Sequence, residues 1–201
     1  MGLSYGVGTS HWRSSTDNYT FLDHRGLVLS EGDVQLRAQN ANRSLRLETL
    51  VPVHEGAFRL GLGIAFEEYQ LSKIEFQSDQ GDDTKAFVET FRFDKFFVQG
   101  EVPLKLFKAD WLGVAVQANA GWYGFTDVNS MSLFGPKRKG KRWFAGCAAV
   151  VDFKVHDVVY LVVMPNVEYK YFFNNRDLIP GRISHNLFDY NLNIGVRVHV
   201  L

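Results

Sequence analysis

The feature that most constrains this chain is an alternation of apolar and polar residues with a period of two. It is clearest near the C-terminus, where apolar side chains occupy every second position from Phe188 to Val200 and mostly polar ones lie between them. Successive side chains of a β-strand point to opposite faces. The pattern therefore predicts a strand with one apolar and one polar face.

The same alternation recurs along the chain and predicts eight strands. The other seven lie at about 3–13, 45–53, 58–66, 98–106, 112–123, 143–155 and 159–171. Short connections (54–56, 108–110 and 156–157) alternate with long ones at about 14–43, 77–86, 127–141 and 174–185. Short turns at one end and long loops at the other are typical of transmembrane β-barrels.

We therefore expect an all-β fold, an eight-stranded antiparallel up-and-down transmembrane β-barrel. Residues 1–201 make one domain of ordinary size. The predicted first loop contains the apolar residues Leu27, Val28, Leu29, Val34 and Leu36, so it could hold an extra hairpin or extend the first two strands. A ten-stranded barrel is thus the alternative count. The longest apolar run, Val158 to Pro165, is far shorter than the roughly 20 residues of a transmembrane helix.

The charged residues on the predicted inner face balance each other. An eight-stranded barrel is just wide enough for side chains to fill, and buried charges need partners. We expect an ion-pair network that plugs the lumen, with a narrow polar conduit as the alternative. Its predicted members are Arg46, Glu48, Arg59, Glu67, Glu101, Lys105, Asp152, Lys154, Glu168, Lys170, Asp189 and Arg197.

The last strand carries a more specific pattern, in which polar Asn193 is followed by Gly195 and then by apolar Val198 and Val200. The strand count, the alternation and the loop asymmetry resemble those of small outer-membrane barrels of the OmpA/OmpX type. The pattern in the last strand resembles the assembly signal of that family. Members of that family usually end in an aromatic residue, whereas this chain ends in Leu201. The resemblance implies insertion by the outer-membrane assembly machinery and a location in the bacterial outer membrane, at the cell surface. Because no export signal follows Met1, we infer that a leader has been removed.

Members of such families are structural proteins, adhesins, porin-like channels or lipid-modifying enzymes. One basic segment could bind lipopolysaccharide phosphates or another anionic surface, or could be an ordinary solvated loop. It contains Lys137, Arg138, Lys139, Lys141 and Arg142. We predict no nucleic-acid partner, because the net charge is zero and there is no long basic block.

We predict neither catalysis nor a cofactor. Ser10, His11, His24, Ser184 and His185 lie at loop ends, but their spacing identifies no nucleophile–base pair. A lipid A-modifying enzyme remains the lower-ranked alternative. No metal site is predicted, because the segment 79–83 lacks calcium-loop spacing and the single cysteine, Cys147, rules out a site built from several thiolates.

The long loops are the expected place of recognition. The third and fourth strands continue above the membrane as an aromatic ribbon that includes Phe87, Phe91 and Phe93, which could pair with a protein partner or pack beneath the first loop. A third hypothesis is a soluble calycin-like barrel that binds an apolar ligand. In that case the apolar faces would point inward and the charges outward.

Overall fold

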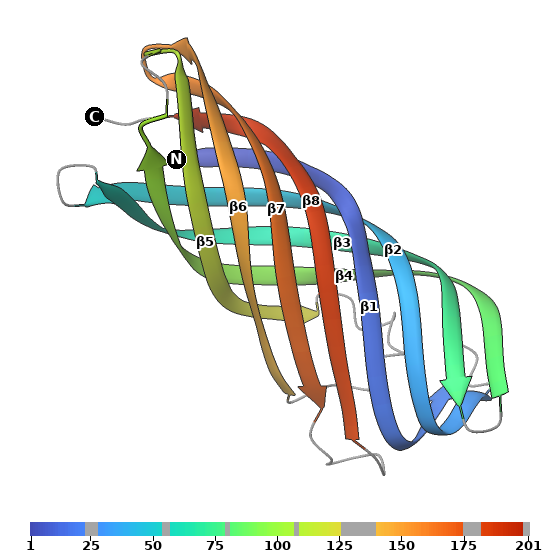
Figure 1. The fold of residues 1–201 in the computed structure, drawn as a ribbon. Helices are drawn as coiled ribbons and strands as arrows, with labels where there is room; N and C mark the ends of the chain where they lie inside the picture. The colour runs from blue at the N-terminus through green and yellow to red at the C-terminus, as the bar shows by residue number, and fades with distance from the viewer. Residues whose placement is uncertain are drawn as a thin grey trace.

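A single antiparallel sheet closes on itself to form a barrel (Figure 1). The computed structural model describes residues 1–22, 28–53, 57–78, 81–106, 109–125, 140–174 and 182–198. The strands in these residues are β1 (Gly2–Leu22), β2 (Val28–Val53), β3 (Phe58–Ser78), β4 (Gly81–Leu104), β5 (Leu112–Phe125), β6 (Gly140–His156), β7 (Val159–Asn174) and β8 (Arg182–Val198). Each strand pairs with the next, and β1 pairs with β8. The prediction of an eight-stranded barrel is confirmed.

The strands are strongly staggered around the ring. A hydrogen-bonded row that starts at Gly2 of β1 crosses all the other strands and returns to β1 at Trp12, ten residues further along (12 − 2). This displacement makes the strands tilt against the barrel axis, as Figure 1 shows. An eight-stranded barrel of this kind encloses only enough space for side chains.

Apolar residues face outward and charged residues face inward. The outer surface carries a band of side chains that are about half exposed, such as Leu62 at 51% and Ile194 at 50%, whereas Glu101, Lys170 and Asp189 are fully buried in the lumen. A water-soluble protein buries its apolar residues instead. The hypothesis of a soluble barrel with an apolar interior is therefore wrong, and the outer band is built to face lipid.

The strands extend to different heights at one end of the barrel. β1 begins and β8 ends at the end of the barrel where β2 is followed by β3, β4 by β5 and β6 by β7, here called the turn side (Figure 1). At the opposite end, the loop side, β1 to β4 continue past β5 to β8 (Figure 1). Much of the segments predicted as loops at 14–43 and 77–86 is therefore strand, and the ten-strand alternative is wrong. No helix in the described part of the chain is long and apolar enough to span a membrane.

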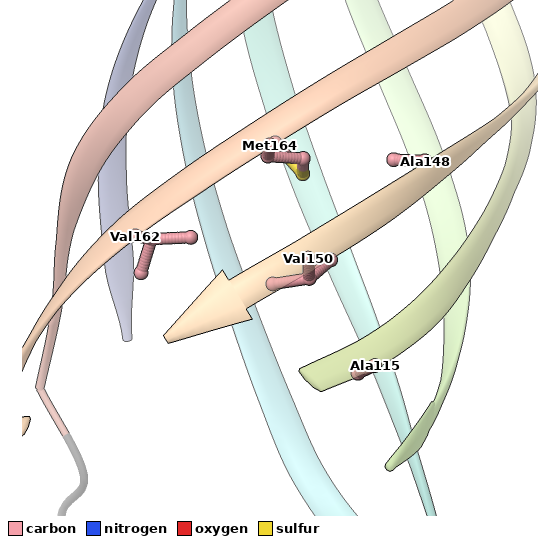
Figure 2. Packing of buried hydrophobic residues seen from close by; sticks show 5 residues of the cluster. All are labelled: Ala115, Ala148, Val150, Val162 and Met164. Carbon is pink, nitrogen blue, oxygen red and sulfur yellow. The ribbon is translucent and has the colours of Figure 1, made fainter. Parts of the chain in front are cut away.

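The turn-side half of the lumen also contains an apolar cluster on the inner faces of β5, β6 and β7 (Figure 2). Its members are Ala115, Ala148, Val150, Val162 and Met164. All five are buried, and Val150 is fully so. The interior is thus filled by apolar side chains as well as by charges, because a narrow barrel has no room for water around every inward position.

Gly63 on β3 shows how tightly the lumen is packed. A Cβ atom at this position would lie 2.2 Å from the ring of Phe97. The glycine therefore makes space for the buried ring of Phe97, its partner on β4. Trp12 on β1 is also inside the lumen and only 1% exposed.

Candidate functional site

A group of charged side chains fills the loop-side half of the lumen. This loop-side network consists of Glu67, Tyr69, Lys95, Glu168, Lys170 and Asp189. The Lys95 Nζ lies 2.7 Å from Glu67 Oε1, and it also pairs with Glu168. The Lys170 Nζ lies 3.2 Å from Glu67 Oε2 and pairs with Asp189. Because these residues come from β3, β4, β7 and β8, the network joins strands on opposite sides of the barrel.

A second group fills the turn-side half. This turn-side network consists of Arg46, Glu48, Arg59, Glu101, Asp152 and Arg197. Arg197 is its centre, since its guanidinium lies 2.9 Å from Glu48, 3.0 Å from Glu101 and 3.2 Å from Asp152. Arg59 lies 2.7 Å from Glu101. One arginine from β8 thus holds carboxylates from β2, β4 and β6.

Two aromatic rings lie between the networks. Phe97 and Phe144 meet edge to face, with their ring centroids 6.2 Å apart. The guanidinium of Arg46 lies 4.4 Å from the Phe97 centroid, and the ammonium of Lys95 lies 4.3 Å from the Phe144 centroid. A cation over an aromatic face is attracted to it. The rings therefore contact a charged residue of each network, and the side chains form one continuous filling.

The structure brings together ten of the twelve residues predicted for the lumen. Lys105 does not join them, because it follows the last residue of β4 and is exposed. Lys154 lies near the end of β6 and pairs with Asp157 of the adjacent turn at 3.0 Å. Lys95 was missed, although it has the same parity as Gln99 and Glu101, because the inward rings of Phe93 and Phe97 break the expected alternation on β4.

The charges of the two networks do not sum to the same value. The turn-side network has three carboxylates and three guanidiniums, whereas the loop-side network has three carboxylates and two ammoniums. Oxygens of Glu67, Glu168 and Asp189 converge within 4.8 Å of one another. Two ammoniums and the Tyr69 hydroxyl, which lies 2.6 Å from Asp189, already contact these oxygens. The arrangement is that of a closed ion-pair cluster in which lysine supplies the cations.

A different cluster lies on the outer wall, just beyond the apolar band on the loop side. This rim triad consists of Arg43 on β2, Glu68 on β3 and Arg92 on β4. The two arginines hold the pKa of the Glu68 carboxyl below its ordinary value, with Arg43 as the stronger influence. Sequence reasoning missed the triad, because only the strand register brings these distant residues into one row.

The outer wall of β5 to β8 carries aromatic residues at the loop-side edge of its apolar band. Trp143 packs against Tyr169 and Tyr171, with ring centroids 5.6 and 5.7 Å apart, and Trp122 pairs with Trp143 in the strand register. On the turn side, Trp111 stacks on Phe153 at 6.4 Å. Two levels of exposed aromatics are the interfacial girdles expected of a barrel that spans a bilayer.

The remaining predicted residues are placed as follows. In the basic segment, 137–139 lie outside the described residues, as does the side chain of Lys141. Arg142 lies on β6 and not in a loop, and it is half-buried with the inward parity of Phe144. In the predicted assembly signal, Asn193 is buried and Val198 is exposed. Gly195 lets β1 approach closely, since a Cβ there would lie 2.2 Å from the Leu3 carbonyl oxygen. Val200 lies outside the described residues.

Of the residues weighed as catalytic candidates, the described ones, Ser10 and His11, point to opposite faces of β1. Ser10 is fully buried in the lumen and accepts a hydrogen bond from Asn40 at 3.3 Å. His11 points outward and contacts the ring of Tyr190. His24 and the side chains of Ser184 and His185 lie outside the described residues. Cys147 is exposed on the lipid-facing wall of β6 between Ala145 and Ala149.

These features define a class of protein. A closed antiparallel ring with an apolar outer band, aromatic girdles and a charged interior is the architecture of outer-membrane β-barrels, and this chain is a transmembrane β-barrel of that type. No protein-family model matches it, and no curated protein sequence matches it with significance.

Solved structures similar to the chain are outer-membrane proteins. The outer membrane protease OmpT from Escherichia coli is 10% identical, with 98% of this chain and 96% of that chain covered and a TM-score of 0.39. The outer membrane protein OprG from Pseudomonas aeruginosa is 8% identical, with 96% and 95% covered and a TM-score of 0.44. The outer membrane protein AlkL in DMPC lipid bilayers is 9% identical, with 100% of this chain and 92% of that chain covered and a TM-score of 0.30. The class assignment rests on the chain's own hydrogen bonding and polarity.

Proposed function

We propose that this protein is a structural and interaction barrel of the bacterial outer membrane, inserted by the outer-membrane assembly machinery. Its lumen is a plug of side chains, and it recognises partners with the part that projects beyond the membrane on the loop side. It is not an enzyme. The observation that carries the proposal is the filling of the lumen by two ion networks and the rings between them.

The plug argues against a solute channel. Residues of both networks are between 0 and 6% exposed to solvent, except for Arg59 near the turn side. Phe97 and Phe144 between the networks are each 1% exposed. A water-filled path would have to pass these side chains, and their cross-barrel ion pairs would have to open first.

The loop-side projection supports a role in recognition. Among the described residues, β4 pairs with β5 only from Phe93 onward, so the stretch from Gly81 to Arg92 pairs with β3 alone. A strand edge presents unpaired backbone N–H and C=O groups that can accept a strand from another chain. A protein partner that adds a strand at this edge is therefore part of the proposal.

The non-enzymatic part of the proposal is supported by the positions of Ser10 and His11. These neighbours point to opposite faces of β1, one into the lumen and one outward, so they do not form a nucleophile–base pair. We expect lipid A to keep its mass after incubation with the folded protein, as measured by mass spectrometry. Loss or gain of an acyl chain would support the lipid-modifying alternative instead.

Current recording across a planar lipid bilayer tests the plug. The protein is first refolded into detergent, and a difference in gel mobility between boiled and unboiled samples shows that the barrel has formed. We then expect no steady current through wild-type protein inserted in the bilayer. Reproducible single-channel steps from the same folded sample would contradict the proposal and favour the narrow conduit.

A further inference from the structure

The rim triad is held together by one carboxylate. Arg43 Nε donates to Glu68 Oε1 at 2.8 Å, and Arg92 Nε donates to Glu68 Oε2 at 2.9 Å. Glu68 is 14% exposed, but the side chains of Arg43 and Arg92 remain 55% and 60% exposed. A guanidinium has five N–H donors in a fixed plane. Glu68 therefore fixes both planes while donors of each guanidinium stay open to the surroundings.

The triad lies where lipid headgroups meet the barrel. On the same three strands, the next outward residues toward the turn side are Leu45, Phe66 and, one step further, Phe96, which are 45 to 52% exposed and belong to the apolar band. A shallow hollow of about 280 Å³ brings the two kinds of surface together. Its lining includes Arg43, Arg92, Leu45 and Phe66.

We propose that the rim triad is a binding site for a phosphorylated glycolipid of the outer leaflet, with lipid A as its minimal form. The two guanidiniums bind a phosphate, for which their planar donor pairs are suited. The acyl chains run down the apolar wall past Phe66. The assignment to the outer leaflet rests on the proposed outer-membrane location. In such barrels the longer loops are extracellular, so the loop side of this barrel meets the outer leaflet.

Asp94 allows a test in which removal of a charge should strengthen lipid binding. It is exposed on the outer face of β4, between Arg92 and Phe96. With Asp94 included, the two arginines and two carboxylates of this surface sum to zero. A phosphate bound by the triad is repelled by Asp94, so removal of that charge strengthens binding, whereas removal of the arginine charges weakens it.

Lipid binding by variants of the refolded protein tests the site. Affinity for bis-phosphorylated lipid A is measured in detergent by native mass spectrometry, after gel mobility has shown that each variant is folded. We expect the double variant R43Q/R92Q to bind at least tenfold more weakly than wild type, and D94N to bind more tightly. Dephosphorylated lipid A should bind wild type at least tenfold more weakly and should no longer distinguish the variants.

The matched control is R13Q/R37Q. Arg13 and Arg37 are exposed cross-strand partners on β1 and β2, further from the apolar band, and their removal changes the net charge by the same amount. We expect its affinity to stay within twofold of wild type. An equal loss in both double variants, or none in R43Q/R92Q, overturns the site, as does an unchanged affinity in D94N.

Two further outcomes separate the sources of failure. If phosphatidylglycerol binds as tightly as lipid A and loses as much affinity in R43Q/R92Q, the site recognises any lipid phosphate and the assignment to a glycolipid is overturned. A folded, heat-modifiable wild type that ignores lipid A overturns the site and leaves the proposed function intact. A wild type that never shows heat-modifiable mobility in detergent refutes the membrane barrel itself.

Discussion

The two halves of the barrel wall meet the loop-side membrane boundary in different ways. β5 to β8 have 14 to 17 residues each and carry aromatic rings at this edge, including Trp122, Trp143 and Tyr171. β1 to β4 have 21 to 26 residues and carry the charged rim triad just beyond the apolar band of β2 to β4. Aromatic side chains anchor a strand at an interface, whereas ion pairs continue it into water. The strands β5 to β8 are therefore adapted to end at the membrane boundary, and the strands β1 to β4 are adapted to continue beyond it.

The lumenal networks hold these two halves together. In the loop-side network, Glu67 and Lys95 come from the long half, and Glu168, Lys170 and Asp189 come from the short half. The two halves thus differ in strand length and outer surface, but they share the charged interior. The stability of the whole barrel should depend most on the shared interior and least on the exposed rim.

The largest expected effect is at Lys95. Lys95→Met removes one of two ammoniums that face three buried carboxylates, and loss of one partner of a buried ion pair costs about 3–5 kcal/mol. Urea unfolding in lipid vesicles measures the change. Lys105→Met is the matched control, because Lys105 is exposed beyond the end of β4, and it should unfold like wild type. A stable Lys95→Met barrel would mean that the halves do not depend on the network.

A pair of alanines tests where the boundary lies on each half. Ala149 faces outward within the apolar band of β6, and Ala41 faces outward on β2, one step beyond Arg43. An arginine facing the bilayer midplane costs about 2–4 kcal/mol, but near the interface only about 0–1 kcal/mol. We therefore expect Ala149→Arg to be much less stable than Ala41→Arg in the same vesicles. Equal losses would show that the long half is embedded as deeply as the short half.

The aromatic edge should contribute less than the interior. Trp143→Ala removes the contacts of the indole with Tyr169 and Tyr171. We expect the free energy of unfolding to fall by about 1 kcal/mol, the scale of aromatic pair contacts. Trp143→Phe keeps a ring at the position and should recover most of the loss. An unaltered Trp143→Ala protein would show that the aromatic edge does not anchor the short half.

The smallest expected effect is at the rim. Glu68→Gln should change the free energy of unfolding by less than about 1 kcal/mol, because ion pairs with exposed partners contribute little. Since Arg43 and Arg92 lower the pKa of Glu68 in the folded protein, its contribution is present above the ordinary carboxyl pKa. It is lost as the pH falls through the lowered value, so wild type and variant should converge in acid. A large, pH-independent loss would assign the triad a structural role.

The fold was predictable because lipid outside and charge inside impose a strict alternation over long segments. The alternation also identified most of the network, including Arg197 and Glu101. It failed at strand ends, where Lys105 and Lys154 keep the inward parity but Lys105 lies beyond the end of β4 and Lys154 pairs with Asp157 of the adjacent turn. The apolar inward residues Val150 and Met164 were not predicted, because they share the inward parity of their strands but not its polar character.

The rim triad could not be predicted from the sequence at all. Arg43 fell in a predicted loop, and Glu68 and Arg92 lay outside the predicted membrane strands 58–66 and 98–106, in the part expected to continue above the membrane. Their meeting depends on the register of β2 against β3 and of β3 against β4, which the turns and the whole ring determine together. Local pattern shows which way a strand's residues point, but not which residue of the next strand lies opposite.

Cys147 allows a spectroscopic label to be attached at a single defined position on the barrel wall. It is the single cysteine of the sequence, and its thiol is exposed on the outer wall of β6, next to Ala118 and Val167 in the strand register. A nitroxide attached there would sit among acyl chains without any cysteine having to be removed. Its relative accessibility to dissolved oxygen and to a water-soluble nickel complex would report the immersion depth of the short half, and so fix the barrel's position in a bilayer.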